Sequence, residues 1–301
     1  MSTQAMGPMA GFDWLKKAIN LGRNNPKAVF GGAALLMLAI AGAMIVVVLL
    51  QLLSSAVFTP GSSGTMVVMG LTMLSVLLVM AVLSAGYLRL VDAVESGRPA
   101  SATDVFHAFG DGAVAWRMIG FLVLLTLLNY AVVIGLLVLL AGDLVDWYVQ
   151  TLRVTVGGGA PDVTGLPDGI GFAYAVMLAV GLVFYAIQAI GMGQVALRGR
   201  GVFAALGDGF AGTVKNLLPL LMLLVAYLLL CVVALLVVFA LVMLFTLLIK
   251  VSPWLALLAV PLYLAALLAI VVVAFGVMYA LWRDVCGGGN VAAAPGDAMT
   301  A

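Results

Sequence analysis

Six long runs of apolar residues dominate the chain, and none has a Lys, Arg, Asp, Glu or His in its interior. A helix needs about 20 mostly apolar residues to cross a bilayer. Because lipid offers no hydrogen-bond partners, the backbone must be satisfied within each segment, and barrel strands would alternate in polarity. We therefore predict an all-α integral membrane protein with six transmembrane helices, at about residues 28–53, 65–88, 118–142, 170–196, 217–249 and 254–282.

Composition excludes an ordinary soluble domain. Apolar residues make up 65% of the 301 residues and charged residues 8%, against roughly half and a quarter in soluble domains. Too little polar side chain remains to cover a surface that faces water. The net charge of +1 creates no field that would recruit nucleic acid, so we expect no nucleic-acid partner.

The basic residues lie almost entirely on one side of these runs. Of the 13 Lys and Arg residues, all but Arg153 and Lys250 fall in the N-terminal segment, the second and fourth loops and the C-terminal tail. Short loops rich in Lys and Arg stay in the cytoplasm during insertion. The pattern predicts a multi-pass protein of the bacterial inner membrane with both termini in the cytoplasm.

The fifth run is longer than a bilayer requires. Residues 217–249 would form a helix of about 50 Å, whereas the hydrocarbon core is about 30 Å thick. Apolar positions within residues 144–152 extend the third run at helical spacing. We expect helices three and five to project together beyond the outer leaflet, and Pro261 to kink helix six.

These runs belong to one predicted domain, residues 1–285. Residues 154–169 are rich in Gly, Pro and Asp, which predicts a flexible external loop. Residues 286–301 contain three consecutive Gly, three consecutive Ala and Pro295, which predicts a disordered cytoplasmic tail.

One segment recurs. Residues 105–112 (VFHAFGDG) match residues 202–209 (VFAALGDG) at an offset of 97, and Phe12–Arg23 is a weaker counterpart. Each copy precedes an apolar run, which predicts three repeats of a short cytoplasmic interfacial helix followed by a transmembrane hairpin. We interpret each Gly-Asp-Gly as a helix stop whose Asp caps the next helix. A metal site is less favoured, because each turn offers one carboxylate.

The N-terminal copy has the pattern of an interfacial helix. Apolar residues share one face and charged residues the other, and Trp14 is suited to anchor at the headgroups. Basic side chains beside an anionic leaflet gain about 1 kcal/mol each. The predicted lipid-contacting residues are Trp14, Lys16, Lys17, Arg23 and Lys27.

The spanning runs carry neutral polar residues only. Transporters coupled to ion gradients usually place ionisable residues inside the membrane, so their absence from these runs argues against ion coupling. One hypothesis makes Asn129, Tyr185 and Gln188 the lining of a small polar cavity. The alternative, which we weight more heavily, makes them partners in hydrogen bonds between helices.

Nothing in the sequence supports an enzyme. The chain has one histidine, two cysteines without a CxxC motif, and no Gly-rich loop after a strand. We therefore expect no catalytic residues, no metal and no cofactor.

Several short motifs resemble a group of uncharacterised inner-membrane proteins from proteobacteria. They are Trp14 with Asn25-Pro26, Gly86-Tyr87-Leu88 with Arg98-Pro99, and Phe106 with Phe109-Gly110, and the likeness covers residues 11–285. A more distant similarity is to the membrane domain of some glycerophosphodiester phosphodiesterases. Their catalytic domain has no counterpart in this sequence, so the resemblance implies no hydrolase activity.

Two functions remain open. The first, which the sequence favours, is a membrane-organising or assembly role, in which the basic cytoplasmic surface holds anionic lipid, a protein partner or a second copy of the chain. The second is a facilitator or carrier of a neutral or lipid-like small molecule without ion coupling.

Overall fold

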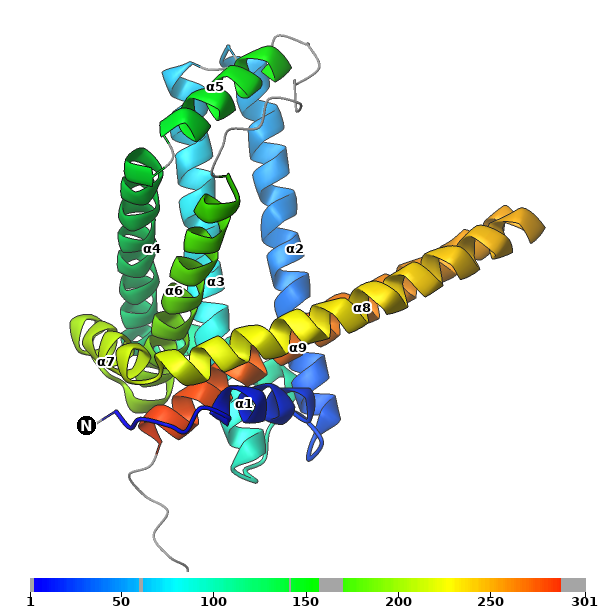
Figure 1. Ribbon diagram of the computed structural model, residues 1–301. Coiled ribbons are helices and arrows are strands. Elements are labelled where there is room, and N and C mark those ends of the chain that lie inside the picture. Colours follow the sequence, from blue (N-terminus) through cyan, green and yellow to red (C-terminus); the bar gives the residue numbers. More distant parts are fainter. Residues whose placement is uncertain (1–2, 60–61, 141, 157–169, 288–301) are drawn as a thin grey trace, which may run out of the picture.

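A bundle of long helices forms the body of the protein (Figure 1). The computed structural model describes residues 3–59, 62–140, 142–156 and 170–287, and these residues form helices and no strands. Six of the helices are long and apolar enough to cross a membrane, which confirms the predicted number. They are α2 (Pro26–Val57), α3 (Ser63–Glu95), α4 (Gly112–Leu140), α6 (Ile170–Arg198), α8 (Leu217–Val251) and α9 (Ala259–Cys286).

Shorter helices lie at the two ends of the bundle. In Figure 1, α1 and α7 lie at the lower end and α5 at the upper end. Three of the short helices, α1, η1 and α7, each come directly before a long helix in the chain. The short elements are α1 (Ala10–Ile19), η1 (Ala102–Gly110), α5 (Gly142–Val156), α7 (Val202–Lys215) and η2 (Pro253–Leu258).

Polar caps fix where the long helices begin. The Asn25 side chain accepts a hydrogen bond from the backbone N–H of Ala28 at 3.1 Å, and Pro26 occupies the first position of α2. Asp111 accepts one from the N–H of Val114 at 3.2 Å, at the start of α4. Such caps satisfy N–H groups that have no partner inside the helix.

Two helices end with glycine in the left-handed conformation. Gly97 follows α3 with φ of 69°, and Gly199 follows α6 with φ of 61°. In both places the next residue, Arg98 or Arg200, donates its N–H back to a carbonyl of the last helical turn. This conformation is energetically unfavourable for a residue with a side chain, so glycine is found directly after or close to the last residue of both helices.

The buried core lies at the end of the bundle where α1 and α7 pack. The fully buried large side chains include Trp14, Tyr87, Phe121, Ile187 and Leu220. By contrast, no residue in the most apolar 18-residue window of α8 is buried inside the protein. A helix that is apolar on all sides and unburied needs lipid as its solvent.

The last hairpin leaves the bundle. In Figure 1, α8 and α9 run obliquely to α2, α3, α4 and α6, and their η2 end lies far from the other helices. A helix of 35 residues is about 52 Å long. Such a helix fits a hydrocarbon core of about 30 Å only when it is steeply inclined.

Two predictions about helix shape are wrong. Helix three does not continue through residues 144–152, because α4 ends at Leu140 and α5 is a separate helix; it does not project alongside α8. Pro261 does not kink helix six, because α9 begins at Ala259 and places the proline in its first turn. The N–H that proline lacks would have no partner there in any case.

Parts of the predicted loop and tail lie outside the described residues. These are 157–169 of the external loop and 288–301 of the C-terminal tail. Within the described part of these segments, residues 154–156 of the predicted loop belong to α5, and Cys286 of the predicted tail belongs to α9.

Close backbone contacts join short helices to long ones. A Cβ placed on Gly86 of α3 would overlap the carbonyl oxygen of Val105 in η1. On Gly209 of α7 it would lie 2.8 Å from the carbonyl oxygen of Ile187, and on Gly276 of α9 2.9 Å from Cα of Ala18. Each contact exists because one partner has no side chain.

We predict that Gly86→Val destabilises the protein by about 1 to 3 kcal/mol, because the backbone of η1 must move. Gly70→Val is the matched control, since Gly70 lies in the same helix and a Cβ there would meet nothing within 4 Å. Thermal unfolding in detergent measures both variants. Equal unfolding midpoints for the two would contradict the assigned contact.

Candidate functional site

A cavity of about 570 Å³ lies between α3, α4 and α6. Each helix contributes one face, because the lining positions recur every three or four residues. The lining residues are Met73, Val76, Leu77, Met80 and Ser84 of α3, Leu122, Leu125, Thr126, Asn129 and Tyr130 of α4, and Gly181, Phe184, Tyr185 and Gln188 of α6.

The structure brings the three predicted cavity residues together. Asn129, Tyr185 and Gln188 line this one cavity, on two facing helices. Thr126 and Tyr130 extend the polar face of α4, each within one turn of Asn129. No ionisable carboxylate, ammonium or guanidinium group lines it.

The carboxamides of Asn129 and Gln188 lack protein partners. Among the described residues, no side chain or backbone group hydrogen-bonds to either. An unsatisfied polar group inside a membrane costs several kcal/mol. These two amides therefore need water or a polar ligand in the cavity to satisfy them.

Tyr185 has a structural role as well. Its hydroxyl donates to the backbone carbonyl of Ala274 in α9 at 3.3 Å. Tyr185 therefore takes part in a hydrogen bond between helices, and this bond connects α6 to α9. Only its remaining surface is available to the cavity.

Sequence reasoning missed the contribution of α3. Ser84 is buried, and Met73 and Met80 are apolar residues within an apolar run. Their only sequence signal is the three- to four-residue spacing of Val76, Met80 and Ser84, which many faces of an apolar helix share.

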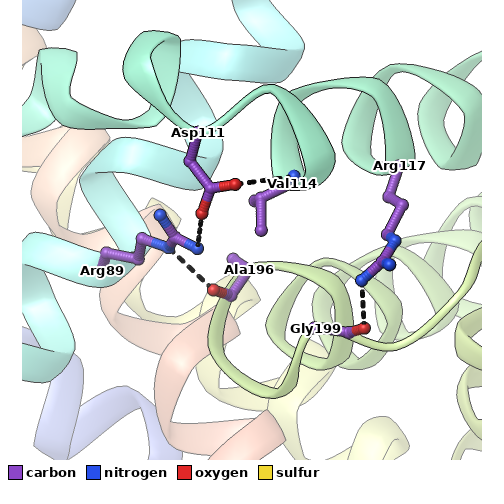
Figure 2. Close-up of polar contacts among 6 residues, drawn as sticks. All are labelled: Arg89, Asp111, Val114, Arg117, Ala196 and Gly199. Atoms are coloured by element: carbon purple, nitrogen blue, oxygen red, sulfur yellow. Dashed lines mark hydrogen bonds and ion pairs between the residues drawn. The ribbon is translucent and has the colours of Figure 1, made fainter.

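A second polar cluster lies where the long helices meet the short ones (Figure 2). The guanidinium of Arg89 donates to Asp111 at 2.8 Å and to the carbonyl of Ala196 at 2.9 Å, linking α3 to α4 and α6. Arg117 donates to the carbonyl of Gly199 at 2.6 Å. The hydrogen bond from Arg89, followed by that from the N–H of Val114, lowers the pKa of Asp111.

The two Gly-Asp-Gly segments differ in structure. Asp111 follows η1 and caps α4, as predicted. Asp208 instead lies inside α7, so the prediction of a helix stop is wrong for the second copy. Its carboxylate accepts hydrogen bonds from Gln194 and Arg200, each at about 3.0 Å. Of the glycines in these two segments, Gly209 is the one that close packing requires, since it lies against the backbone of α6.

Trp14 is not a lipid anchor. Its side chain is 0% exposed, and its Nε1–H donates to Asp284 of α9 at 3.0 Å. The apolar face of α1 therefore packs against α8 and α9, and no surface of Trp14 remains to contact lipid headgroups. This corrects the predicted lipid-contacting set.

The four basic residues of that set remain on the surface. Lys17 forms an ion pair with Asp284 at 2.7 Å. Lys16, Arg23 and Lys27 are exposed and have no partner among the described residues. These three are therefore available for anions.

The comparisons with known proteins add no relative. No protein-family model, curated protein or solved structure matches this chain. The resemblance to proteobacterial inner-membrane proteins and phosphodiesterase membrane domains stays a prediction. The helices and the cavity define the class more coarsely, as a multi-pass helical membrane protein.

Proposed function

We propose that this protein is a non-enzymatic carrier or facilitator that binds a neutral or lipid-like small molecule in the cavity between α3, α4 and α6. The observation that carries the proposal is the pair of unpartnered carboxamides, Asn129 and Gln188, which line one cavity within spanning helices. Two such groups are costly in a dry bundle and useful in a binding site.

The lining indicates the chemistry of the ligand. Met80, Leu77 and Phe184 offer apolar contact, and the carboxamides offer hydrogen-bond donors and acceptors. A charged ligand would find no counter-charge among the lining side chains. A volume of about 570 Å³ lies within the range of small-molecule sites, about 300–1,000 Å³.

The position of the cavity supports entry from the bilayer. Tyr130 is 60% exposed and Met73 is 53% exposed, and both line the cavity. Both lie on spanning helices, so their exposed surfaces face lipid. A lipid-like molecule would therefore reach the carboxamides from the side, without crossing an aqueous vestibule.

A second candidate function is a cytoplasmic platform for anionic lipid or a protein partner, in a membrane-organising role. It is favoured by the contrast among the basic residues. Lys17, Arg89 and Arg200 are each paired with a carboxylate. Lys16, Arg23 and Lys27 are exposed without one in the described part of the chain. We infer an inner-membrane protein with both termini cytoplasmic, which puts this surface on the anionic leaflet.

The three predicted repeats are part of the proposal, in a modified form. Each short helix packs on both helices of one hairpin: η1 on α2 and α3, α7 on α4 and α6, and α1 on α8 and α9. The first helix of the chain thus occupies on the last hairpin the place that η1 and α7 occupy on the hairpins before them. We infer that the three units close on one another.

Polar contacts follow the same three-part order. A side chain near the start of each hairpin donates a hydrogen bond to a backbone carbonyl. That carbonyl lies in the segment that precedes the short helix packed on the same hairpin. Asn25 donates to Ala100 at 3.2 Å, Arg117 to Gly199 at 2.6 Å and Asn216 to Gln4 at 2.9 Å. Asn25 and Asn216 directly precede their long helices, whereas Arg117 lies in the second turn of α4. The three hydrogen bonds support a repeated architecture.

We predict that the double variant Asn129→Leu, Gln188→Leu loses about tenfold in labelling by a photoreactive diacylglycerol probe, because two hydrogen bonds are removed. The same variant should unfold at an equal or higher temperature without probe, since unsatisfied polar groups are replaced by apolar ones. Ser75→Leu on α3, outside the cavity, is the control. Undiminished labelling, or a lowered midpoint without probe, would show that the amides serve structure alone.

We predict that Lys16→Gln, Arg23→Gln, Lys27→Gln reduces the preference for phosphatidylglycerol over phosphatidylcholine, because each cation contributes about 1 kcal/mol beside an anionic leaflet. Spin-labelled lipids in mixed vesicles measure this preference. Arg153→Gln, Lys250→Gln removes the basic residues of the opposite side and should change it little. An unaltered preference in the triple variant rules out the lipid platform.

We predict that a circular permutant with residues 3–23 moved behind residue 287 folds with a near-native unfolding midpoint. The N–H of Gln4 already donates to the carbonyl of Val285 at 2.9 Å, so the new junction is short. Deletion of residues 3–23 should lower the midpoint strongly, because it removes Trp14 from the core. A permutant no more stable than the deletion would refute the closed repeat.

A further inference from the structure

A second pocket, of about 380 Å³, lies where α1, the end of α3 and the last turns of α9 meet. It is separate from the cavity between α3, α4 and α6 and shares no lining residue with it. Its lining residues are Lys17, Leu21, Glu95, Gly276, Tyr279, Ala280, Arg283 and Asp284.

Most of the charges around this pocket are already paired. Lys17 pairs with Asp284 at 2.7 Å. Outside the lining, Asp92 pairs with Arg98 and also accepts a hydrogen bond from the Tyr279 hydroxyl at 3.0 Å. The charges of these four paired groups, two positive and two negative, therefore cancel.

One charge of each sign remains. The Glu95 carboxylate has no hydrogen bond or ion pair among the described residues. The Arg283 guanidinium has no anionic partner there and lies over the Tyr279 ring, 5.9 Å from its centre. The pocket therefore offers one free anion, on α3, and one free cation, on α9.

We propose that this pocket binds a phosphoethanolamine group, that is, a phosphodiester joined to a primary ammonium. Arg283 donates paired N–H groups to the phosphate, a geometry that guanidinium suits. Lys17 adds a second donor, since an ammonium has three N–H groups and Asp284 occupies one. Glu95 accepts hydrogen bonds from the ligand ammonium.

The balance of free charges selects the ligand class. A purely anionic headgroup such as phosphatidylglycerol would satisfy Arg283 and leave Glu95 facing a like charge. A choline headgroup has no N–H to donate to Glu95. Leu21 and Ala280 supply apolar wall beside the charged groups, and the pocket lies at the ends of spanning helices, where headgroups are found.

The test uses the full-length protein in neutral detergent with equimolar dioleoyl phosphatidylethanolamine, phosphatidylglycerol and phosphatidylcholine, read by native mass spectrometry. We expect phosphatidylethanolamine to be retained about tenfold over each of the others. Glu95→Gln should lower its retention and raise that of phosphatidylglycerol. Arg283→Gln should lower both.

Controls separate this pocket from its surroundings. Asp13→Asn removes an exposed charge of α1 outside the pocket and should leave the preference unchanged. Ser75→Leu, on α3 outside both pockets, should do the same. Because Glu95→Gln is expected to gain affinity for one lipid, an unfolded variant cannot imitate the result.

Added glycerophosphoethanolamine distinguishes the two sources of the group. If it displaces the lipid at equal concentration, the pocket serves a water-soluble ligand; if it does not, the pocket serves a membrane lipid, and both outcomes support the proposed chemistry. Equal retention of phosphatidylglycerol and phosphatidylethanolamine by the unaltered protein would overturn it. So would a Glu95→Gln variant that keeps the original preference.

Discussion

The structure depends on close packing of three short helices against the ends of the long ones. Lipid gives no hydrophobic driving force between helices, so association relies on close contact and on polar groups. At one end of the bundle, Gly86, Gly209 and Gly276 allow that contact at three separate places. The other end of α8 has none of it, and that helix leaves the bundle.

The ion pairs described above lie at the same end of the bundle as these close contacts. Carboxylates at the ends of the helices are held by cations from neighbouring helices. Asp111 is held by Arg89 (Figure 2), and Asp284 is held by Lys17. Ion pairs of this kind contribute little energy at an exposed surface. Their value here is geometric, because Arg89 reaches two other helices from one side chain and sets how they meet.

Hydropathy predicted the six long helices, since it reports on the environment that those residues need. It placed the helix ends less well. The predicted second run stops at residue 88 because Arg89, Asp92 and Glu95 are charged, yet α3 continues to Glu95. A helix can extend past its apolar segment, because water and capping groups satisfy its last backbone groups there. Amphipathicity predicted the apolar face of α1 but assigned Trp14 to lipid headgroups, because a single helix does not show that α8 and α9 cover this face. Asn129 and Gln188 were predicted because polar residues stand out in an apolar run, whereas Ser84 and Met80 do not.

The contact between α1 and α9 constrains the order of assembly. Trp14 and Asp284 are 270 residues apart, so at 5–20 residues per second the ribosome makes the partner roughly 15 to 50 s after the tryptophan. Before α8 is made, the apolar face of α1 has neither of the helices that cover it, and until α9 is made it has only α8. We therefore expect α1 to lie on the membrane surface at first. Once α9 is complete, α1 leaves the lipid and packs in its final position against α9.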